Sequence, residues 1–213
     1  MLTAEDLERQ KEHFAKRTVQ FTSLGYDRFA AASFIIDQGG VLEGPALDIG
    51  TGMGITAREL ARRGLDVVTI DTNADDQRVA SFLTDDPVLA NRLTFTLADA
   101  AALPFPDGHF GCAVAVDVLH HLESGGSVLA ELVRVVKPGG AVVLGDFTVE
   151  GFALVSKVHA GEGRIHPEGP VTVDWACGFL CALGLTERHV AGGHMHDVRV
   201  LRTPHHADLP DGQ

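Results

Sequence analysis

Short apolar runs alternate with segments of helical spacing along most of this 213-residue chain, and this alternation limits the fold more than any other feature. Strands of this kind, joined by helices of about ten residues, are typical of βαβ units with a parallel sheet buried on both faces. Crossovers between parallel strands are nearly always right-handed, so the pattern predicts a doubly wound α/β fold. The strand candidates are residues 46–49, 67–70, 93–97, 112–116 and 141–144, and the clearest helix candidates are residues 55–63 and 127–136.

Helical segments precede this core. Residues 3–38 are predicted to be helical, with Thr3 and Asp6 as a capping box and Gly39-Gly40 as a stop. After the core we expect a loop over 161–170, helices over 152–159 and 173–183, and strands over 187–190 and 197–201. The expected division is therefore a helical cover (1–40), one core domain (41–203) and a polar, disordered tail (204–213).

Composition argues against several kinds of partner. The chain has 17 Lys+Arg against 29 Asp+Glu, a net charge of −12, which disfavours nucleic acid or an anionic membrane. Its three cysteines imply no disulfide framework and fit a reducing compartment. It has no apolar run of about 18 residues and no signal-peptide pattern. We therefore expect a cytoplasmic protein with no membrane partner.

The segment ALDIGTGMG, residues 46–54, carries the strongest functional signal. Its glycines allow backbone N–H groups to approach a ligand at the carboxyl end of a strand, where open α/β sheets bind ligands. A tight strand-to-helix connection would also explain a glycine-rich turn. The G-x-G-x-G spacing differs from the dinucleotide pattern, and no Lys-Ser/Thr ending makes it a P-loop. Asp48 would repel a pyrophosphate but suits a ligand with a cationic head.

Two further acids follow predicted strands. Asp71 closes the second strand, where a carboxylate can accept hydrogen bonds from both hydroxyls of a ribose. Asp99 follows the third strand and could accept a hydrogen bond from an exocyclic amine. Either acid alone is as well explained as a solvated turn or N-cap residue. Together with Asp48 they mark the ends of three successive strands, which share one cleft.

Five motifs in this order resemble the class I S-adenosylmethionine-dependent methyltransferases, and in particular their small-molecule branch. The resemblance covers about residues 44–146 and implies S-adenosylmethionine as cofactor and S-adenosylhomocysteine as product. It also implies a Rossmann-like, mostly parallel seven-stranded sheet that ends in an antiparallel hairpin. The motifs are ALDIGTGMG, VVTIDTN, ADAAALPFPDGHF, AVAVDVLHHL and RVVKPGG.

The resemblance also implies residue roles. The glycines would embrace the amino-acid part of the cofactor, and Asp48 would lie near its ammonium group, directly or through water. Asp71 occupies the ribose position, Asp99 the adenine position with Ala100 beside the ring, and Asp117 faces the methionine half and the acceptor. The implied cofactor-binding residues are Asp48, Ile49, Gly50, Thr51, Gly52, Gly54, Asp71, Thr72, Asp99, Ala100 and Asp117.

A sulfonium cofactor needs no protein nucleophile, so the enzyme must align the acceptor, hold it and remove its proton. His120 and His121 lie where the loop should face the methyl group, and a histidine can act as a general base. The resemblance equally explains them as a helix start and pocket wall. Tyr26, the only tyrosine, is a third catalytic candidate, with core packing as its alternative role.

Histidines are also frequent near the C-terminus. Together they could ligate a divalent metal that orients an acceptor oxygen, but no compact ligand motif is present. We therefore interpret them as separate surface and acceptor-pocket residues and predict no metal site. His194 and His196 would share one face if their segment were a strand. The residues concerned are His159, Glu162, His166, His194 and His196.

These observations predict a methyltransferase that acts on a small-molecule acceptor by in-line displacement, with a homodimer left open. One alternative is a non-catalytic S-adenosylmethionine-binding sensor or partner subunit. A second is a nucleotide-cofactor oxidoreductase, which the glycine spacing and Asp48 disfavour. Neither the acceptor nor the atom that gains the methyl can be derived, because fold and cofactor site do not fix them.

Overall fold

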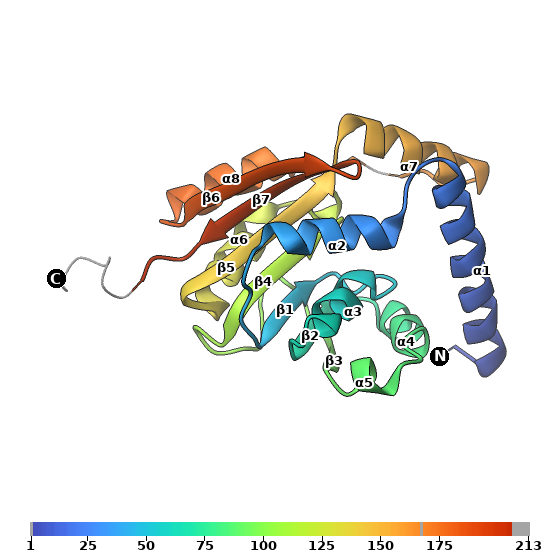
Figure 1. Cartoon of the computed structure of the whole chain (residues 1–213), viewed down its shortest axis with the longest axis horizontal. Coiled ribbons are helices and arrows are strands. Elements are labelled where there is room, and N and C mark those ends of the chain that lie inside the picture. Colours follow the sequence, from blue (N-terminus) through green and yellow to red (C-terminus); the bar gives the residue numbers. More distant parts are fainter. Residues whose placement is uncertain (1, 167, 206–213) are drawn as a thin grey trace.

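The computed structural model describes residues 2–166 and 168–205. In this part of the chain a seven-stranded sheet has the order β3-β2-β1-β4-β5-β7-β6 (Figure 1). Strands β1 to β5 pair in parallel, and β7 pairs antiparallel with both β5 and β6. This confirms the predicted α/β fold with its antiparallel last hairpin. The strands are β1 (Ala46–Ile49), β2 (Val67–Asp71), β3 (Leu93–Leu97), β4 (Phe110–Val116), β5 (Val136–Phe147), β6 (Thr186–Gly193) and β7 (His196–Arg202).

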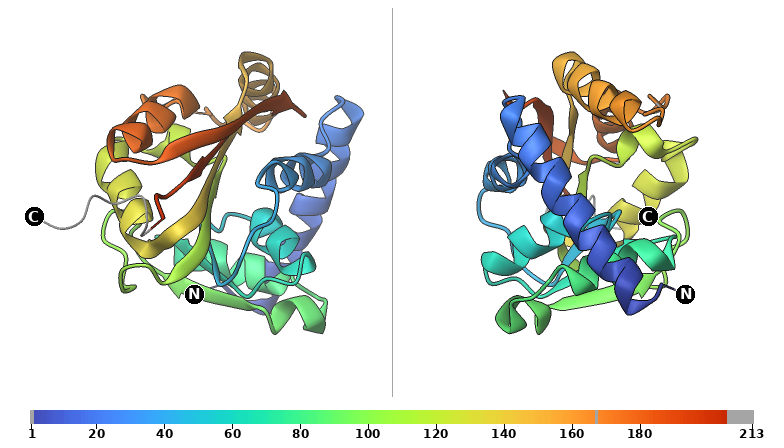
Figure 2. Two further views of the ribbon diagram at one scale, coloured as in Figure 1. Left: turned by 60° about the vertical axis from the view of Figure 1, so that its left-hand side comes forward. Right: turned by 90° about the vertical axis from the view of Figure 1, so that its right-hand side faces the viewer.

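Helices cover both faces of the sheet, because successive strand residues are buried on opposite sides (Figure 2). Leu47 of β1 packs in one apolar cluster with Leu132 of α6. Ala46 next to it packs in the other cluster, with Ile35 of α2 and Leu60 of α3. The helices are α1 (Ala4–Ser23), α2 (Arg28–Gln38), α3 (Ile55–Arg62), α4 (Ala74–Phe82), α5 (Pro87–Ala90), α6 (Gly125–Val135), α7 (Val149–Gly161) and α8 (Val173–Ala182), with a 3-10 turn at Leu119–His121.

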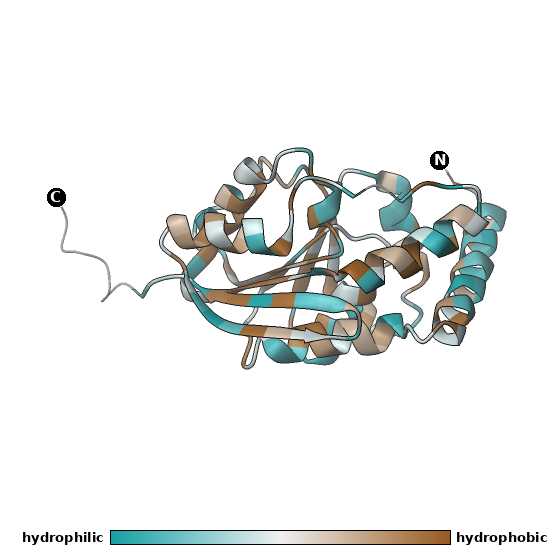
Figure 3. Cartoon of the chain, turned by 90° about the horizontal axis from the view of Figure 1, so that it is seen from above, coloured by the Kyte–Doolittle hydropathy of each residue, from teal (hydrophilic) through white to brown (hydrophobic). Residues whose placement is uncertain are grey.

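The first helix lies across the end of the molecule toward which β5 runs, next to α7 (Figure 1). Its start confirms the predicted capping box, since the Thr3 hydroxyl accepts the Asp6 N–H (3.1 Å) and the Asp6 carboxylate accepts the Thr3 N–H (2.8 Å). Farther along α1, Arg17 forms an ion pair with Glu162, which follows α7 (3.1 Å). The two helices therefore border the space above the carboxyl ends of the parallel strands. Coloured by hydropathy, α1 is mostly hydrophilic (Figure 3).

Two local expectations are wrong in detail. Residues 137–140 end the preceding helix as predicted, but they form an irregularity inside β5, since Phe110 pairs with Val136 and Cys112 with Ala141. Helices α4 and α5 were not expected from the sequence, although Asn73 and Asp86 cap their N-termini with side-chain hydrogen bonds. Short polar side chains at such positions satisfy otherwise free N–H groups.

Of the predicted tail, Pro204 and His205 are described, and the Pro204 carbonyl accepts a hydrogen bond from Gly139 N–H. Residues 206–213 lie outside the described residues. Within the described ranges, we find no helix with the length and apolar character needed to cross a lipid bilayer.

Candidate functional site

In the glycine loop between β1 and α3, side chains would be strained by the backbone conformation and, at Gly50 and Gly54, by close neighbours. Gly50 has φ 82°, and a Cβ there would lie 3.0 Å from Val118 Cγ2. Gly54 has φ 70° and caps the N-terminus of α3, with its Cβ position 3.2 Å from the Ala80 side chain. The carbonyl of Ile70 accepts hydrogen bonds from both Gly50 and Thr51 (2.9 Å each), which fixes the loop to the end of β2. At Gly52, φ is 46° and the space around the Cβ position is open.

The strand-end acids are held by backbone N–H groups. The Asp71 carboxylate accepts from Gly52 (3.2 Å) and from Asn73 (2.9 Å), which ties the end of β2 to the glycine loop. The Asp99 carboxylate accepts from Ala101 (2.8 Å). An ionised carboxylate has about four acceptor positions, so both acids keep capacity for a ligand.

Residues of the glycine loop and the two strand-end acids line a cavity of about 470 Å³, which we call the outer cleft. It brings together eight of the predicted cofactor-binding residues from the ends of β1, β2, β3 and β4. They are Ile49, Gly50, Gly52, Asp71, Thr72, Asp99, Ala100 and Asp117. Thr51 lines a neighbouring cavity instead, and Gly54 caps α3.

Asp48 lies behind the loop and lines neither cavity. It is 1% exposed; one carboxylate oxygen accepts the Thr69 hydroxyl (2.7 Å) and the other has no hydrogen-bond partner. Burial raises the pKa of Asp48 to about 7, against the effect of the Thr69 hydrogen bond and with the Asp71 charge adding to it. A cationic ligand head would complete its interactions, and no such cation is present among the side chains around it.

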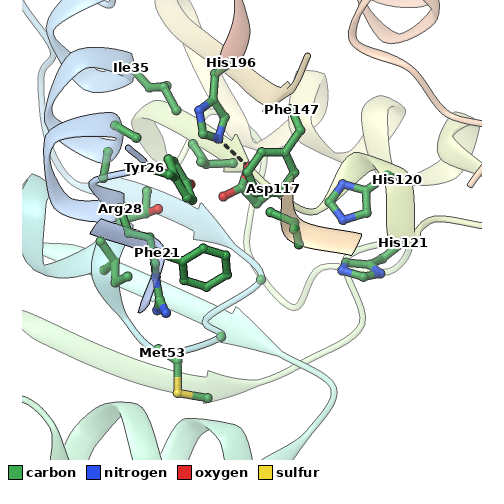
Figure 4. Close-up of a pocket in the computed structure, with 18 of the residues that line it drawn as sticks. Phe21, Tyr26, Arg28, Ile35, Met53, Asp117, His120, His121, Phe147 and His196 are labelled. Carbon is green, nitrogen blue, oxygen red and sulfur yellow. Dashed lines mark hydrogen bonds and ion pairs between the residues drawn. The ribbon is translucent and has the colours of Figure 1, made fainter. Parts of the chain in front are cut away.

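A second cavity of about 290 Å³, the inner cavity, adjoins the outer cleft (Figure 4). Four residues line both, namely Gly50, Gly52, Asp117 and His121. The inner cavity draws its walls from α1, α2, the ends of β4, β5 and β7, and the loop after α7. It contains all three predicted catalytic candidates, His120, His121 and Tyr26.

Asp117 stands where the two cavities meet and is bound to a buried histidine. It has φ 54°, and its Oδ1 accepts from His196 Nε2 (2.8 Å), as Figure 4 shows. His196 Nδ1 donates to the His194 carbonyl (2.8 Å), so both ring nitrogens face acceptor oxygens. Burial lowers the pKa of His196, but Asp117, the His194 carbonyl and Asp146 together outweigh burial and raise it.

The expected shared strand face for His194 and His196 is wrong. His194 and Met195 have φ 51° and 65° and form the turn between β6 and β7. His159 and His166, by contrast, do come together, with ring centroids 4.7 Å apart. No three His, Cys, Asp or Glu side chains of the described ranges are arranged to hold a metal ion.

The two remaining loop histidines differ in their surroundings. His120 is 3% exposed, and its Nδ1 lies 2.6 Å from Asp146 Oδ1, while its Nε2 has no partner. The His121 side chain has no hydrogen bond in the described chain, and burial together with His120 lowers its pKa. Tyr26 is buried edge-on between Phe21 and Phe147, and burial raises its pKa well above 10.

Arg28, which lines the inner cavity, and Asp146, which lies behind His120, were missed by the sequence analysis. Arg28 of α2 stacks on Phe14 (4.7 Å), its guanidinium has no carboxylate or hydrogen-bond partner in the described chain, and burial lowers its pKa to about 10. Asp146, the last acid of β5, was also missed, although its position after a buried apolar run matches that of Asp71. Arg28 gives no such signal, because nothing in a helix sequence reports an unpaired guanidinium.

Comparison with known proteins places these features in a family. Residues 47–144 match the model of a family described as a methyltransferase domain. The ubiquinone/menaquinone biosynthesis C-methyltransferase UbiE of Pseudomonas paraeruginosa is 32% identical over 130 residues, which are 59% of this chain and 51% of that protein. A 2-methyl-6-phytyl-1,4-hydroquinone methyltransferase of Synechocystis is 38% identical over 102 residues, 47% of this chain and 31% of that protein. The chain thus spans about half the length, or less, of these curated relatives.

A SAM-dependent methyltransferase from Methanosarcina mazei has a similar structure, with a TM-score of 0.64 and 22% identity, over 80% of this chain and 97% of the other. At this identity the likeness concerns the fold. The family match extends the likeness to the glycine loop and the strand-end acids, because these residues lie within the matched range 47–144. In family match, motif order and fold the chain is therefore similar to the class I S-adenosylmethionine-dependent methyltransferases.

Proposed function

We propose that the protein binds S-adenosylmethionine in the outer cleft and transfers its methyl group to a small-molecule acceptor in the inner cavity. The observation that carries this proposal is the convergence of the glycine loop and strand-end acids on a cleft that adjoins a second cavity. The names of the relatives, which describe methyltransferases of quinone biosynthesis and of a hydroquinone, support a small acceptor. The family match gives no comparable support to a nucleotide-dependent oxidoreductase.

The polar groups of the outer cleft fit the adenosine half of this cofactor. Asp71 keeps free acceptor positions for the two ribose hydroxyls, and Asp99 for the adenine amine. Ala100 and Ile49 offer apolar surface for the ring, with Thr72 beside them.

The amino-acid half is also matched in charge. The unpaired Arg28 guanidinium suits its carboxylate, and the unpartnered Asp48 oxygen suits its ammonium group, directly or through water. The open space at Gly52 leaves room between them. The cofactor thus supplies partners that the described chain does not provide for these two groups.

When bound, the cofactor supplies a methyl carbon that its sulfonium already activates. The chain's own residues orient the acceptor and keep water out, for which the buried rings of Phe21 and Tyr26 and the partly buried ring of Phe147 are suited. His196 donates to Asp117 at the junction of the cavities, where a carboxylate favours positive charge.

Calorimetric titration of S-adenosylhomocysteine into the full chain tests the cofactor assignment, with NADH as the competing ligand. We expect micromolar binding of the first and no saturable binding of the second. Saturable NADH binding without S-adenosylhomocysteine binding would instead favour the oxidoreductase. Transfer of a labelled methyl group to a panel of small acceptors then separates an enzyme from a cofactor-binding sensor.

A further inference from the structure

His120 differs from the other histidines of the inner cavity in having Nδ1 bound to a buried carboxylate and Nε2 without a partner. Its Nδ1 donates to Asp146 Oδ1 (2.6 Å), and its Nε2 is buried and has no hydrogen-bond partner among the described residues. A neutral imidazole with a proton on Nδ1 presents the Nε2 lone pair. His120 lines the cavity, and a molecule that reaches its buried Nε2 would find this lone pair without a protein partner.

Asp146 holds this arrangement in place. It is 3% exposed and also accepts hydrogen bonds from the backbone N–H groups of His120 (3.1 Å) and Phe147 (2.9 Å). These bonds join the loop after β4 to the end of β5. A carboxylate on Nδ1 fixes the tautomer and stabilises the imidazolium that forms when Nε2 takes a proton.

The other candidates lack one of these properties. His196 has both nitrogens engaged, and His159 accepts from Arg17 (2.6 Å). Burial lowers the pKa of His166 to about 4, with the neighbouring His120 adding to the effect, which makes it a weak base near neutral pH. Tyr26 stays protonated because its pKa is raised.

The walls around His120 suit a flat, apolar acceptor. The Phe147 and Phe152 rings lie 5.9 and 5.1 Å from its ring, and Tyr26 and Phe21 line the same cavity. Aromatic walls of this kind pack edge-on or offset against another ring. A volume of about 290 Å³ limits the acceptor, or the part of it that enters, to roughly one substituted ring.

We propose that His120 is the general base of the reaction, that Asp146 is its positioning residue, and that the acceptor is a small hydroxylated aromatic compound. This rests on the proposed function. The acceptor hydroxyl gives its proton to Nε2, leaving an oxyanion beside an imidazolium paired with Asp146. The electron pair, from the oxygen or from the ring carbon beside it, forms a bond to the methyl carbon while the carbon–sulfur pair returns to sulfur. On the carbon path the ring proton then leaves to water.

The titratable groups that face His120 come from several elements. They are Asp146 at the end of β5, His121 in the same turn and His166 in the loop after α7, with Asp117, His159 and Arg17 farther along the cavity wall. A test must therefore report the proton at His120 itself, and a chromophoric acceptor does so.

4-Nitrocatechol serves as this probe, because the visible absorbance of its ring reports ionisation without any methyl transfer. With S-adenosylhomocysteine present, we expect the wild type to bind it with an ionisation midpoint lower than that in solution. His120→Asn should abolish this shift while retaining a donor for Asp146. The same variant should lower kcat for methylation of catechol by about 10²- to 10⁴-fold. With 4-nitrocatechol, which is already ionised in mildly alkaline buffer, the loss should stay below about tenfold.

Asp146→Asn should reproduce this difference between the two catechols with little change in KM, which a purely structural role would not do. His189→Asn, on the exposed edge strand β6, is the matched control and should behave as the wild type. If His120→Asn loses S-adenosylhomocysteine binding, His120→Gln replaces it. An unchanged midpoint in the folded variant, an equal loss with both catechols, or S-adenosylhomocysteine binding without recognition of either catechol would overturn this inference alone. Absence of S-adenosylhomocysteine binding to the wild type would instead overturn the proposed function.

Discussion

The outer cleft and the inner cavity adjoin, yet they are assembled differently. The outer cleft is lined by residues between Ile49 and Val128, which come from successive strand–loop units. The inner cavity is lined by residues from Arg17 in α1 to His196 in β7. The outer cleft thus follows from the order of neighbouring segments in the chain, whereas the inner cavity depends on packing between segments far apart in sequence.

This difference explains what the family match covers. Residues 47–144 include all the residues that line the outer cleft but omit Tyr26, Arg28, Asp146 and His196. A change in the outer cleft should therefore alter affinity for the common cofactor, and a change in the inner cavity should alter acceptor chemistry or local stability, except at Arg28, which faces the amino-acid part of the cofactor. The predictions that follow test this separation, beginning with the largest expected effect.

Asp71→Ala should weaken S-adenosylhomocysteine binding by about 10- to 100-fold in calorimetry. A hydrogen bond to a charged group contributes about 1.5–3 kcal/mol, and tenfold in affinity corresponds to about 1.4 kcal/mol. Asp66→Ala is the matched control, because Asp66 lies just before the same strand at its other end and pairs with Arg92 on the surface. Equal weakening by both substitutions would mean that Asp71 supports the sheet and not the ribose.

Arg28→Met should weaken S-adenosylhomocysteine binding about tenfold, through loss of a charge-assisted hydrogen bond. It should leave the affinity for 5′-methylthioadenosine unchanged, since that compound lacks the amino-acid part. Asp71→Ala should weaken both ligands. A loss of methylthioadenosine affinity in Arg28→Met would show that Arg28 shapes the whole cleft and would break the division between the two regions.

The residues of the outer cleft could be predicted from the sequence better than those of the inner cavity, and the reason is physical. Asp71 and Asp99 follow apolar strands directly, and parallel strands bring their carboxyl ends to one edge, so chain order suffices to bring them together. The parallel strands and the last two strands of the sheet could be predicted in the same way, from β-branched runs separated by helices. The bond between Asp117 and His196 spans 79 positions and depends on the turn at His194, a position between two predicted strands whose conformation the sequence left open. His120 could be named from its loop, but its pairing with Asp146 could not.

Affinity for S-adenosylhomocysteine should rise with pH between about 6 and about 8 and then level off. Burial raises the pKa of Asp48 to about 7, so at lower pH a neighbouring ammonium group must first displace its proton. Each pH unit below that value should cost up to about tenfold in affinity. Calorimetry in buffers of different ionisation enthalpy should detect the released proton. Asp48→Asn should remove both the pH dependence and the proton release, and a slope that persists in this variant would assign it elsewhere.

Thermal stability should fall as pH rises through the folded-state pKa of His196. That pKa is raised by Asp117 in spite of burial, so the stabilising contribution is fully present below about 6.5 and is lost above the folded value. Each unit by which the pKa is raised corresponds to about 1.4 kcal/mol, or about 3–6 °C in Tm for a chain of this size. His196→Asn should flatten this part of the Tm-against-pH curve, whereas Asp71→Ala should leave it unchanged. If Asp71→Ala flattened it as well, the two cavities would be coupled through the glycine loop and would not be separate units.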